Sequence, residues 1–248
     1  MILTGCCGWA GSRARYFADF AAVELQSTFY QPPSAELAAR WRSAAPADFV
    51  FTMKAWQLIT HAPSSPTYRK LQTAIDRARA EHYGGFQWSS EVEQAWHATR
   101  SIAQALRAEV VVFQCPASFE PTAKNQRNLE RFFREIGPCP WVNAWEPRGK
   151  WEPALVAELC EKLDLVHCVD PFAAEMAHGR MAYFRLHGRG GVFYRYTDEE
   201  LRALAEMCAR ECARGRSPVY VMFNNAYLRE DAARFQKMSG GRGTGITV

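Results

Sequence analysis

The sequence has no long apolar run and no recognisable targeting segment. No stretch approaches the roughly 18 consecutive apolar residues that a membrane-spanning helix needs. The first residues, Met1 to Cys6, lack the basic start and the apolar stretch of a secretory signal peptide. We therefore expect a cytoplasmic protein that has no membrane partner.

The common signatures of nucleotide and metal sites are also missing. The first predicted strand is followed by Gly8-Trp9-Ala10-Gly11, which has neither GxGxxG nor Walker spacing. No HExxH or HxH pair occurs, and none of the 8 cysteines is spaced as CxxC. These absences exclude a zinc-ribbon or ferredoxin pattern, and we predict no cofactor.

The cysteines are expected to be free, buried thiols, as in most cytosolic proteins. Cys208 and Cys212 are one helical turn apart, which is a poor geometry for a disulfide. A thermophile that uses disulfides is the exception that the sequence leaves open. An iron–sulfur site built on Cys6, Cys7 and Cys115 is disfavoured, because the alternation of the strands places Cys7 and Cys115 on the outer face.

The composition is that of an ordinary globular protein. The 248 residues are 48% hydrophobic and 23% charged, with 16 Gly and 13 Pro, which excludes disordered and collagen-like chains. Thirty Lys and Arg against 26 Asp and Glu give a net charge of +4 and a pI near 8.6. A dedicated nucleic-acid binder usually has a higher pI or a basic cluster.

Short apolar, β-branched or aromatic runs alternate with segments of helical period. The predicted strands are Ile2–Gly8, Ala22–Thr28, Phe49–Ala55, Glu109–Cys115, Trp141–Arg148, Leu165–Asp170, Ala182–Gly188 and Pro218–Asn225. Helix starts are indicated by Ser34, by a capping box of Ser90 with Glu93, by Thr122, by Pro153 at a first helical position and by a capping box of Thr197 with Glu200. The stretch Thr60–Gln87 is expected to be an inserted loop with a helix from Thr67.

Eight strand–helix units in a chain of this length predict an α/β protein with a TIM-like (β/α)8 barrel of parallel strands and outer helices. The main rival is an open doubly wound sheet, which usually has fewer strands. We expect residues 1–239 to form a single barrel domain and residues 240–248 to be a flexible, glycine-rich tail.

Polar residues concentrate at the carboxyl ends of the predicted strands, where barrel enzymes build their active sites. Side chains alternate along a strand, so one parity faces the interior. Charged residues are rarely buried unless they are paired, which makes an active or binding site the preferred interpretation. The inward set is Glu24, Gln26, Thr28, Thr52, Lys54, Gln114, Glu146, Arg148, Asp170, Tyr183, Arg185, His187 and Asn224 or Asn225, with Arg189 just beyond.

Each charge type suggests a role. Arginine forks suit carboxylates and phosphates, His187 is a candidate general acid or base, and Lys54 among cations is a candidate nucleophile or base. Simple ion pairing inside the barrel is the alternative for Glu24 and Lys54, and a hydrogen-bonded core histidine is the alternative for His187. A divalent metal is a less favoured alternative, for which the ligands would be Glu24, Glu146, Asp170 and His187.

Several segments together resemble one family. They are Gly5–Trp9, Val23–Tyr30, Phe51–Ala55, Leu58–His61, Phe113–Phe119, Trp145–Arg148, Tyr183–Arg189 and Val221–Asn225. In this order they are similar to motifs of the YecE-like family, a domain of unknown function, and span nearly the whole chain. The resemblance implies a TIM-like barrel. The family's Thr-Ser pair on the first strand is Cys6-Cys7 here, and its histidine motif on the fifth strand is Trp145-Glu146-Pro147-Arg148.

The resemblance also implies which residues belong to the site. The positions that match family motifs are Glu24, Tyr30, Lys54, His61, Gln114, Glu146, Arg148, Asp170, Arg185, His187, Arg189, Asn224 and Asn225. We assign Glu24, Lys54, Glu146, Asp170 and His187 to catalysis. We assign the rest to substrate binding.

Three functions remain open at this point. The first is an enzyme, a hydrolase or an isomerase/lyase, that applies general acid/base chemistry to an anionic, hydroxylated small molecule or phosphoester. The second is a protein that binds or processes nucleic acid, since phosphodiesters are also anionic. The third is a barrel that binds a small molecule without turning it over. The oligomeric state is not indicated by any pattern.

Overall fold

The computed structural model describes residues 1–240, and within them eight parallel strands close into a barrel in chain order, with β8 pairing with β1. This confirms the predicted fold class. The strands are β1 (Ile2–Cys7), β2 (Ala22–Leu25), β3 (Val50–Lys54), β4 (Val110–Gln114), β5 (Val142–Glu146), β6 (Val166–Val169), β7 (Ala182–Leu186) and β8 (Val219–Phe223).

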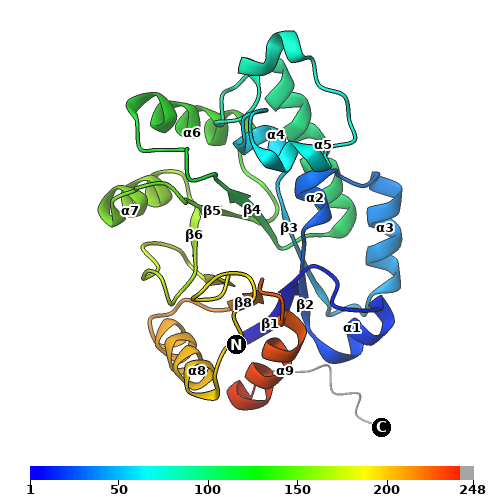
Figure 1. Cartoon of the computed structure of the whole chain (residues 1–248), viewed down its shortest axis with the longest axis vertical. Helices are drawn as coiled ribbons and strands as arrows, with labels where there is room; N and C mark the ends of the chain where they lie inside the picture. The colour runs from blue at the N-terminus through cyan, green and yellow to red at the C-terminus, as the bar shows by residue number, and fades with distance from the viewer. Residues whose placement is uncertain (241–248) are drawn as a thin grey trace.

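Helices surround the ring of strands, as Figure 1 shows. The longer ones are α3 (Ala35–Ala44), α5 (Ser90–Leu106), α6 (Ala123–Ile136), α7 (Pro153–Lys162), α8 (Asp198–Ala213) and α9 (Leu228–Ser239). Shorter ones are α1 (Arg13–Asp19), α2 (Ser27–Tyr30) and α4 (Gln57–Thr60), with 3₁₀ turns η1 (Pro66–Lys70) and η2 (Arg77–His82). None of the helices in residues 1–240 combines the length and apolarity needed to cross a bilayer.

The strands are buried on both faces, which explains why they read as continuous apolar runs. On the outer face, Phe113 of β4 packs against Phe132 and Phe133 of α6, with ring centroids 5.6 and 5.1 Å apart. Trp96 of α5 also packs against Phe132, at 6.0 Å. The core between barrel and helices is therefore aromatic in this sector.

The helix starts follow the predicted capping residues with one exception. The hydroxyl groups of Ser34 and Thr122 accept from backbone N–H groups of their helices, and Thr197 and Glu200 form the reciprocal capping box. At α5 the cap is Ser89, whose Oγ accepts from Val92 N at 3.2 Å. The predicted capping box of Ser90 with Glu93 was therefore wrong by one residue, because adjacent serines leave the sequence pattern ambiguous.

The predicted helix from Thr67 is present only as the five-residue 3₁₀ helix η1. The segment between α4 and α5 contains only the 3₁₀ turns η1 and η2. Gly84, at φ +79°, brings this segment against the backbone of His61, where an added Cβ would lie 2.4 Å from the His61 carbonyl. The backbone of Gly84 and Phe86 then bonds to α4, so these hydrogen bonds replace those of a continuous helix.

The second strand is shorter than predicted. It ends at Leu25, and α2 begins at Ser27, so Gln26 and Thr28 do not continue the strand. Thr28 is buried and its hydroxyl donates to the carbonyls of Leu25 and Lys54. At the other end of the chain, Gly240 closes α9 in the left-handed conformation. The rest of the predicted glycine-rich tail, 241–248, lies outside the described residues.

Candidate functional site

Arg185 of β7 lies at the centre of the barrel interior, and its side chain is fully buried. Its Nε donates to Glu24 Oε2 at 3.0 Å, and its Nη2 lies 2.9 Å from Glu24 Oε1. Its Nη1 donates to Glu146 Oε2 and, at 3.2 Å, to Gln114 Oε1. Burial alone would lower the pKa of Arg185, but Glu146 and Glu24 outweigh burial and raise it. The guanidinium is therefore a permanent positive charge between two carboxylates.

Glu146, at the end of β5, connects this buried group to the barrel mouth. Its Oε1 accepts from Arg148 Nε at 2.8 Å and lies 3.1 Å from His187 Nε2. Burial would raise the pKa of Glu146, but Arg185, His187 and Arg148 together hold it well below 4.5. Glu146 is therefore ionised at neutral pH. The side chains of Arg148 and His187 remain 37% and 26% exposed, so they can meet a ligand from solvent.

Ring nitrogen Nε2 of His187 has both a hydrogen-bond acceptor and a hydrogen-bond donor beside it. Its Nε2 faces Glu146 Oε1 at 3.1 Å and Arg148 Nη2 at 2.7 Å. Its Nδ1 lies 3.0 Å from Asn224 Nδ2. The ring thus has a partner in either tautomer, which is the arrangement that a group needs if it gains and loses a proton in turn.

Lys54, at the end of β3, is only 3% exposed. Its Nζ donates to Gln114 Oε1 at 2.7 Å and lies 3.6 Å from the centroid of the Phe29 ring. Burial, followed by the charge of Arg185, lowers the pKa of Lys54 to about 7. A large fraction of Lys54 is therefore the free amine at neutral pH, which a lysine in solution is not.

A cavity of ≈ 670 Å³ opens at the carboxyl ends of β5, β6 and β7. Glu146, Arg148, Asp170 and His187 line its polar side, and Trp151, Val156 and Ala173 contribute to its apolar side. This volume fits a small molecule. The cluster and the cavity together place ionisable groups where barrel enzymes bind their substrates.

Most of the predicted site residues form one connected network. The members are Glu24, Lys54, Gln114, Glu146, Arg148, Arg185, His187 and Asn224. Asp170 joins through the backbone, because its Oδ2 accepts from His187 N at 3.0 Å while Oδ1 accepts from Phe172 N. Asp170 therefore fixes the turn that carries His187.

Two predicted residues lie beside this network. The His61 ring packs edge-on against Phe29 at 4.9 Å. Burial, followed by the charges of Lys54 and Arg148, lowers the pKa of His61 to about 4. Tyr30 packs against Phe29 and receives Lys70 Nζ over its ring at 4.4 Å. Both residues support the Lys54 side of the site rather than the cavity.

The remaining two predicted residues are engaged elsewhere. Arg189 Nη1 pairs with Glu200 Oε1 at 2.9 Å, and its side chain is 55% exposed. Asn225 is buried and donates to Asp231 Oδ2 and Tyr194 O. In these contacts Asn225 connects the end of β8 to α9.

The side chains proposed as metal ligands are engaged in other contacts. The carboxylates of Glu24 and Glu146 each form an ion pair with Arg185. The carboxylate of Asp170 accepts hydrogen bonds from two backbone N–H groups. Across residues 1–240, no group of three or more His, Cys, Asp or Glu side chains is arranged to hold a metal ion. The four proposed ligands therefore do not form a metal site here.

Cys7 faces the barrel interior, so its predicted place on the outer face was wrong. Cys7 is opposite Glu24 in the β1–β2 register, and its Sγ lies 3.8 Å from Arg185 Nη2 inside the barrel. Cys6 instead contacts Tyr16 and Leu228 on the outside. The register between β1 and β2, which strand alternation alone does not give, decides this parity. All eight cysteines are free, as predicted.

Two other contributors were not assigned to the site. Tyr183 OH donates to Glu24 Oε2 at 2.9 Å and lies 2.7 Å from Thr52 Oγ1. Tyr183 was predicted to face the barrel interior, but it was given no role in the site. His167 lines the cavity from β6; it lies mid-strand, where the sequence offers no comparable signal.

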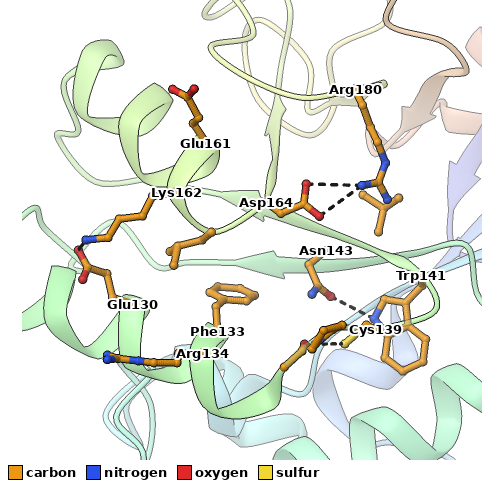
Figure 2. Close-up of a pocket in the computed structure, with 14 residues that line it drawn as sticks. Glu130, Phe133, Arg134, Cys139, Trp141, Asn143, Glu161, Lys162, Asp164 and Arg180 are labelled. Atoms are coloured by element: carbon orange, nitrogen blue, oxygen red, sulfur yellow. Dashed lines mark hydrogen bonds and ion pairs between the residues drawn. The ribbon is translucent and has the colours of Figure 1, made fainter.

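A second cavity, of ≈ 740 Å³, lies at the opposite end of the barrel between α6 and α7 (Figure 2). It surrounds the residues that begin β5 and precede β6 and β7, including Trp141, Val142, Asp164 and Arg180. Two ion pairs of its lining, Arg180 with Asp164 at 3.4 Å and Lys162 with Glu130 at 2.8 Å, lie at the surface. Among the residues that line it there is no buried ionisable cluster, in contrast to the carboxyl-end cavity.

The fold and the site define a (β/α)8 barrel protein with a compensated cluster of ionisable groups at the carboxyl ends of its strands. The chain belongs to the DUF72 family, described as proteins of unknown function, whose family model matches residues 4–243. YecE-like is another name for this family, so the predicted resemblance is confirmed.

Solved structures of the family have the same fold. A DUF72 family protein from Enterococcus faecalis V583 is similar in two crystal structures, at 18% and 20% identity with TM-scores of 0.74 and 0.73. Each match covers 97% of this chain and 96% or 98% of that chain. A DUF72 family protein from Thermotoga maritima MSB8 is 22% identical, with a TM-score of 0.69 over 96% of this chain and 98% of that chain. The comparison with curated proteins found no match.

Proposed function

We propose that this protein is an enzyme that applies general acid/base chemistry to an anionic, hydroxylated small molecule or phosphoester. The observation that carries the proposal is the position of His187 Nε2 between Glu146 Oε1, at 3.1 Å, and Arg148 Nη2, at 2.7 Å, at the edge of a ≈ 670 Å³ cavity. A purely structural ion-pair network has no need for a titratable group at a cavity wall.

The roles follow from what each side chain can still contact. Arg148 uses its partly exposed guanidinium for the anionic group of the substrate, because planar forks bind carboxylates and phosphates with two hydrogen bonds. His187 transfers the proton, and Glu146 holds and stabilises the imidazolium form. Arg185 is fully buried and held by Glu24, and its positive charge keeps Glu146 ionised and in place.

The first experiment is a thermal-shift screen with phosphorylated and carboxylated metabolites, followed by titration of each hit. We expect Arg148→Gln to weaken binding of a hit roughly tenfold to a hundredfold, the value of a lost charge-assisted hydrogen bond. Arg189→Gln is the matched control, since Arg189 pairs with Glu200 outside the network. Equal loss in both variants would contradict the assignment of Arg148.

Turnover separates an enzyme from a binding protein. For any hit, the reaction is followed by NMR of the substrate with the wild type and with His187→Gln. Catalysis that His187→Gln abolishes while binding persists supports the proposal. Binding without turnover would support a small-molecule sensor instead, and salt-dependent binding of short DNA or RNA in place of metabolites would support a nucleic-acid role.

A further inference from the structure

We propose that Lys54 is a nucleophile that forms a Schiff base, so that the substrate of this site is an anionic carbonyl compound such as a 2-oxo acid or a phosphorylated ketone. The inference rests on the proposed function, because Arg148 supplies the contact for the anionic group. It narrows the reaction to the isomerase or lyase class, in which an iminium accepts the electrons of a neighbouring bond.

The first argument is that Lys54 is a buried lysine without a carboxylate partner. Within residues 1–240 its Nζ has one hydrogen-bond acceptor, the neutral amide oxygen Gln114 Oε1 at 2.7 Å. The nearby carboxylates are already bound, Glu24 by Arg185 and Tyr183, and Glu146 by Arg185 and Arg148. A lysine kept only to balance charge would be expected to pair with one of them.

The second argument concerns the charges that face Lys54. It ends β3, and charged or titratable groups approach it from several elements: Glu24 from β2, Glu146 and Arg148 from the end of β5, Arg185 from β7 and His61 from the residue after α4. Burial and the two arginines favour the free amine, and they outweigh the two glutamates, so that the pKa of Lys54 is lowered to about 7. His61 is neutral at this pH, because its own pKa is lowered to about 4.

The third argument is position. Gln114, which holds the amine, is only half-buried, and its Oε1 also accepts from Arg185 Nη1. Lys54 does not itself line the ≈ 670 Å³ cavity, but it is connected to the cavity wall at Glu146 through Gln114 and Arg185. Displacing the Gln114 amide would open the amine to a carbonyl carbon without disturbing the Arg185 pairs with Glu24 and Glu146. The Phe29 ring, at 3.6 Å, stabilises the positive iminium as it does the ammonium.

The chemistry balances without any further reactant. The free amine of Lys54 adds to the carbonyl carbon to give a carbinolamine. Loss of water, which carries away the carbonyl oxygen and the two amine hydrogens, leaves the imine, and one added proton gives the iminium. Added cyanoborohydride reduces this iminium to a secondary amine and so makes the link permanent.

The test is reductive trapping at pH 7 with pyruvate, dihydroxyacetone phosphate and neutral glycolaldehyde, each with cyanoborohydride, followed by peptide mapping. Lys70 is the matched control in the same molecule, since its Nζ also lies over an aromatic ring, at 4.4 Å from Tyr30, but it is exposed. At pH 7 a pKa of about 7 gives Lys54 a roughly thousandfold larger fraction of free amine than an ordinary lysine. We expect Lys54 to be labelled at least about tenfold faster than Lys70, after an allowance for its burial.

The possible results test the Schiff base and the anion site separately. Preferential labelling of Lys54 by pyruvate or dihydroxyacetone phosphate, lost in Arg148→Gln, supports both. Labelling of Lys54 by glycolaldehyde alone supports the Schiff base and contradicts the anion site. Metabolite binding that depends on Arg148, with Lys54 labelled no faster than Lys70 by any of the three, overturns the Schiff base and leaves the proposed function standing. The comparison of Lys54 with Lys70 is made within the wild-type chain, so the test of the Schiff base itself does not depend on a variant that folds.

Discussion

Arg185 and Glu24 form a two-bond ion pair in which neither side chain has any exposed surface. The two bonds, Nε to Oε2 at 3.0 Å and Nη2 to Oε1 at 2.9 Å, join β7 to β2 across the barrel interior. Glu146 binds the remaining terminal nitrogen of the same guanidinium. One arginine thus positions the carboxylate that contacts His187.

This pair predicts a large stability effect for Arg185→Met. Removal of the guanidinium leaves two buried carboxylates without their main partner, and breaking a buried pair costs about 3–5 kcal/mol of unfolding free energy. Urea denaturation at pH 7 measures the loss. The matched control is Lys162→Met, which breaks the exposed pair of Lys162 with Glu130, 2.8 Å apart, and should cost less than about 1 kcal/mol. Equal losses would show that the interior pair is no more important than the surface pair.

Two buried histidines predict a loss of stability in mild acid. Burial is the largest cause that lowers the pKa of His61 and of His167 from 6.5 to about 4. The unfolded chain therefore binds these protons first, and the stability present above pH 6.5 is lost as the pH falls toward 4. Each histidine should contribute on the order of 1–2 kcal/mol between pH 6.5 and 5.

The check is urea unfolding at pH 7, 6 and 5. His61→Asn with His167→Asn should flatten the pH dependence, since an Asn side chain can still accept the bond that Ala177 N gives to His167 Nδ1. His97→Asn is the control, because His97 is 63% exposed. If the double variant retains the full pH dependence, the lowered pKa values of His61 and His167 are not its cause.

How well each site residue could be predicted from the sequence depends on which physical factor determines its position. Lys54, Glu146 and Arg185 were predictable because strand alternation and the cost of unpaired buried charge both point inward. Cys7 was misplaced because its face depends on the register of β1 with β2, where it is opposite Glu24. Arg189 lies beyond the end of β7 at Leu186, where strand alternation no longer applies, and its partner Glu200 belongs to the first turn of α8.

The same distinction holds for the fold. The barrel was predictable from repeated strand–helix units, since parallel strands joined by helices close in few ways. The inserted loop over Thr60–Gln87 was predicted, but its internal structure was not, because it depends on single contacts such as Tyr68 OH to His61 O, at 2.8 Å, and on Gly84 at φ +79°. Such contacts produce no periodic pattern of residues in the sequence.

Lys54 predicts a pH dependence of the same sign at higher pH, where stability increases toward alkali. Its pKa is lowered from 10.5 to about 7, mainly by burial and then by Arg185. Between these values the unfolded chain holds a proton that the folded chain lacks, so stability rises with pH across this window. Wild type should therefore gain a few kcal/mol relative to Lys54→Met between pH 7 and 10.5. Unfolding of both proteins at pH 7 and at pH 10.5 measures this gain. If the difference in unfolding free energy between the two proteins is the same at both pH values, the lowered pKa of Lys54 is contradicted.

The adjacent amides Asn224 and Asn225 predict separate losses. Asn224 is half-buried, and its Nδ2 lies 3.0 Å from His187 Nδ1. Asn225 is buried and donates to Asp231 Oδ2 at 2.7 Å and to Tyr194 O at 2.8 Å. Replacing Asn225 by Ala leaves a buried carboxylate and a carbonyl short of a donor, so it should cost about 1–3 kcal/mol of unfolding free energy. Replacing Asn224 by Ala should cost less than about 1 kcal/mol, because solvent can reach its partner.

The readout that separates them is the His187 ring. In NMR spectra of ¹⁵N-labelled protein, Asn224→Ala should change the tautomer pattern of His187, because the contact at Nδ1 is removed. Asn225→Ala should leave that pattern unchanged while it lowers the urea midpoint. If Asn225→Ala shifts the His187 signals as strongly as Asn224→Ala, the two amides act as one unit and the site extends to Asp231 and α9.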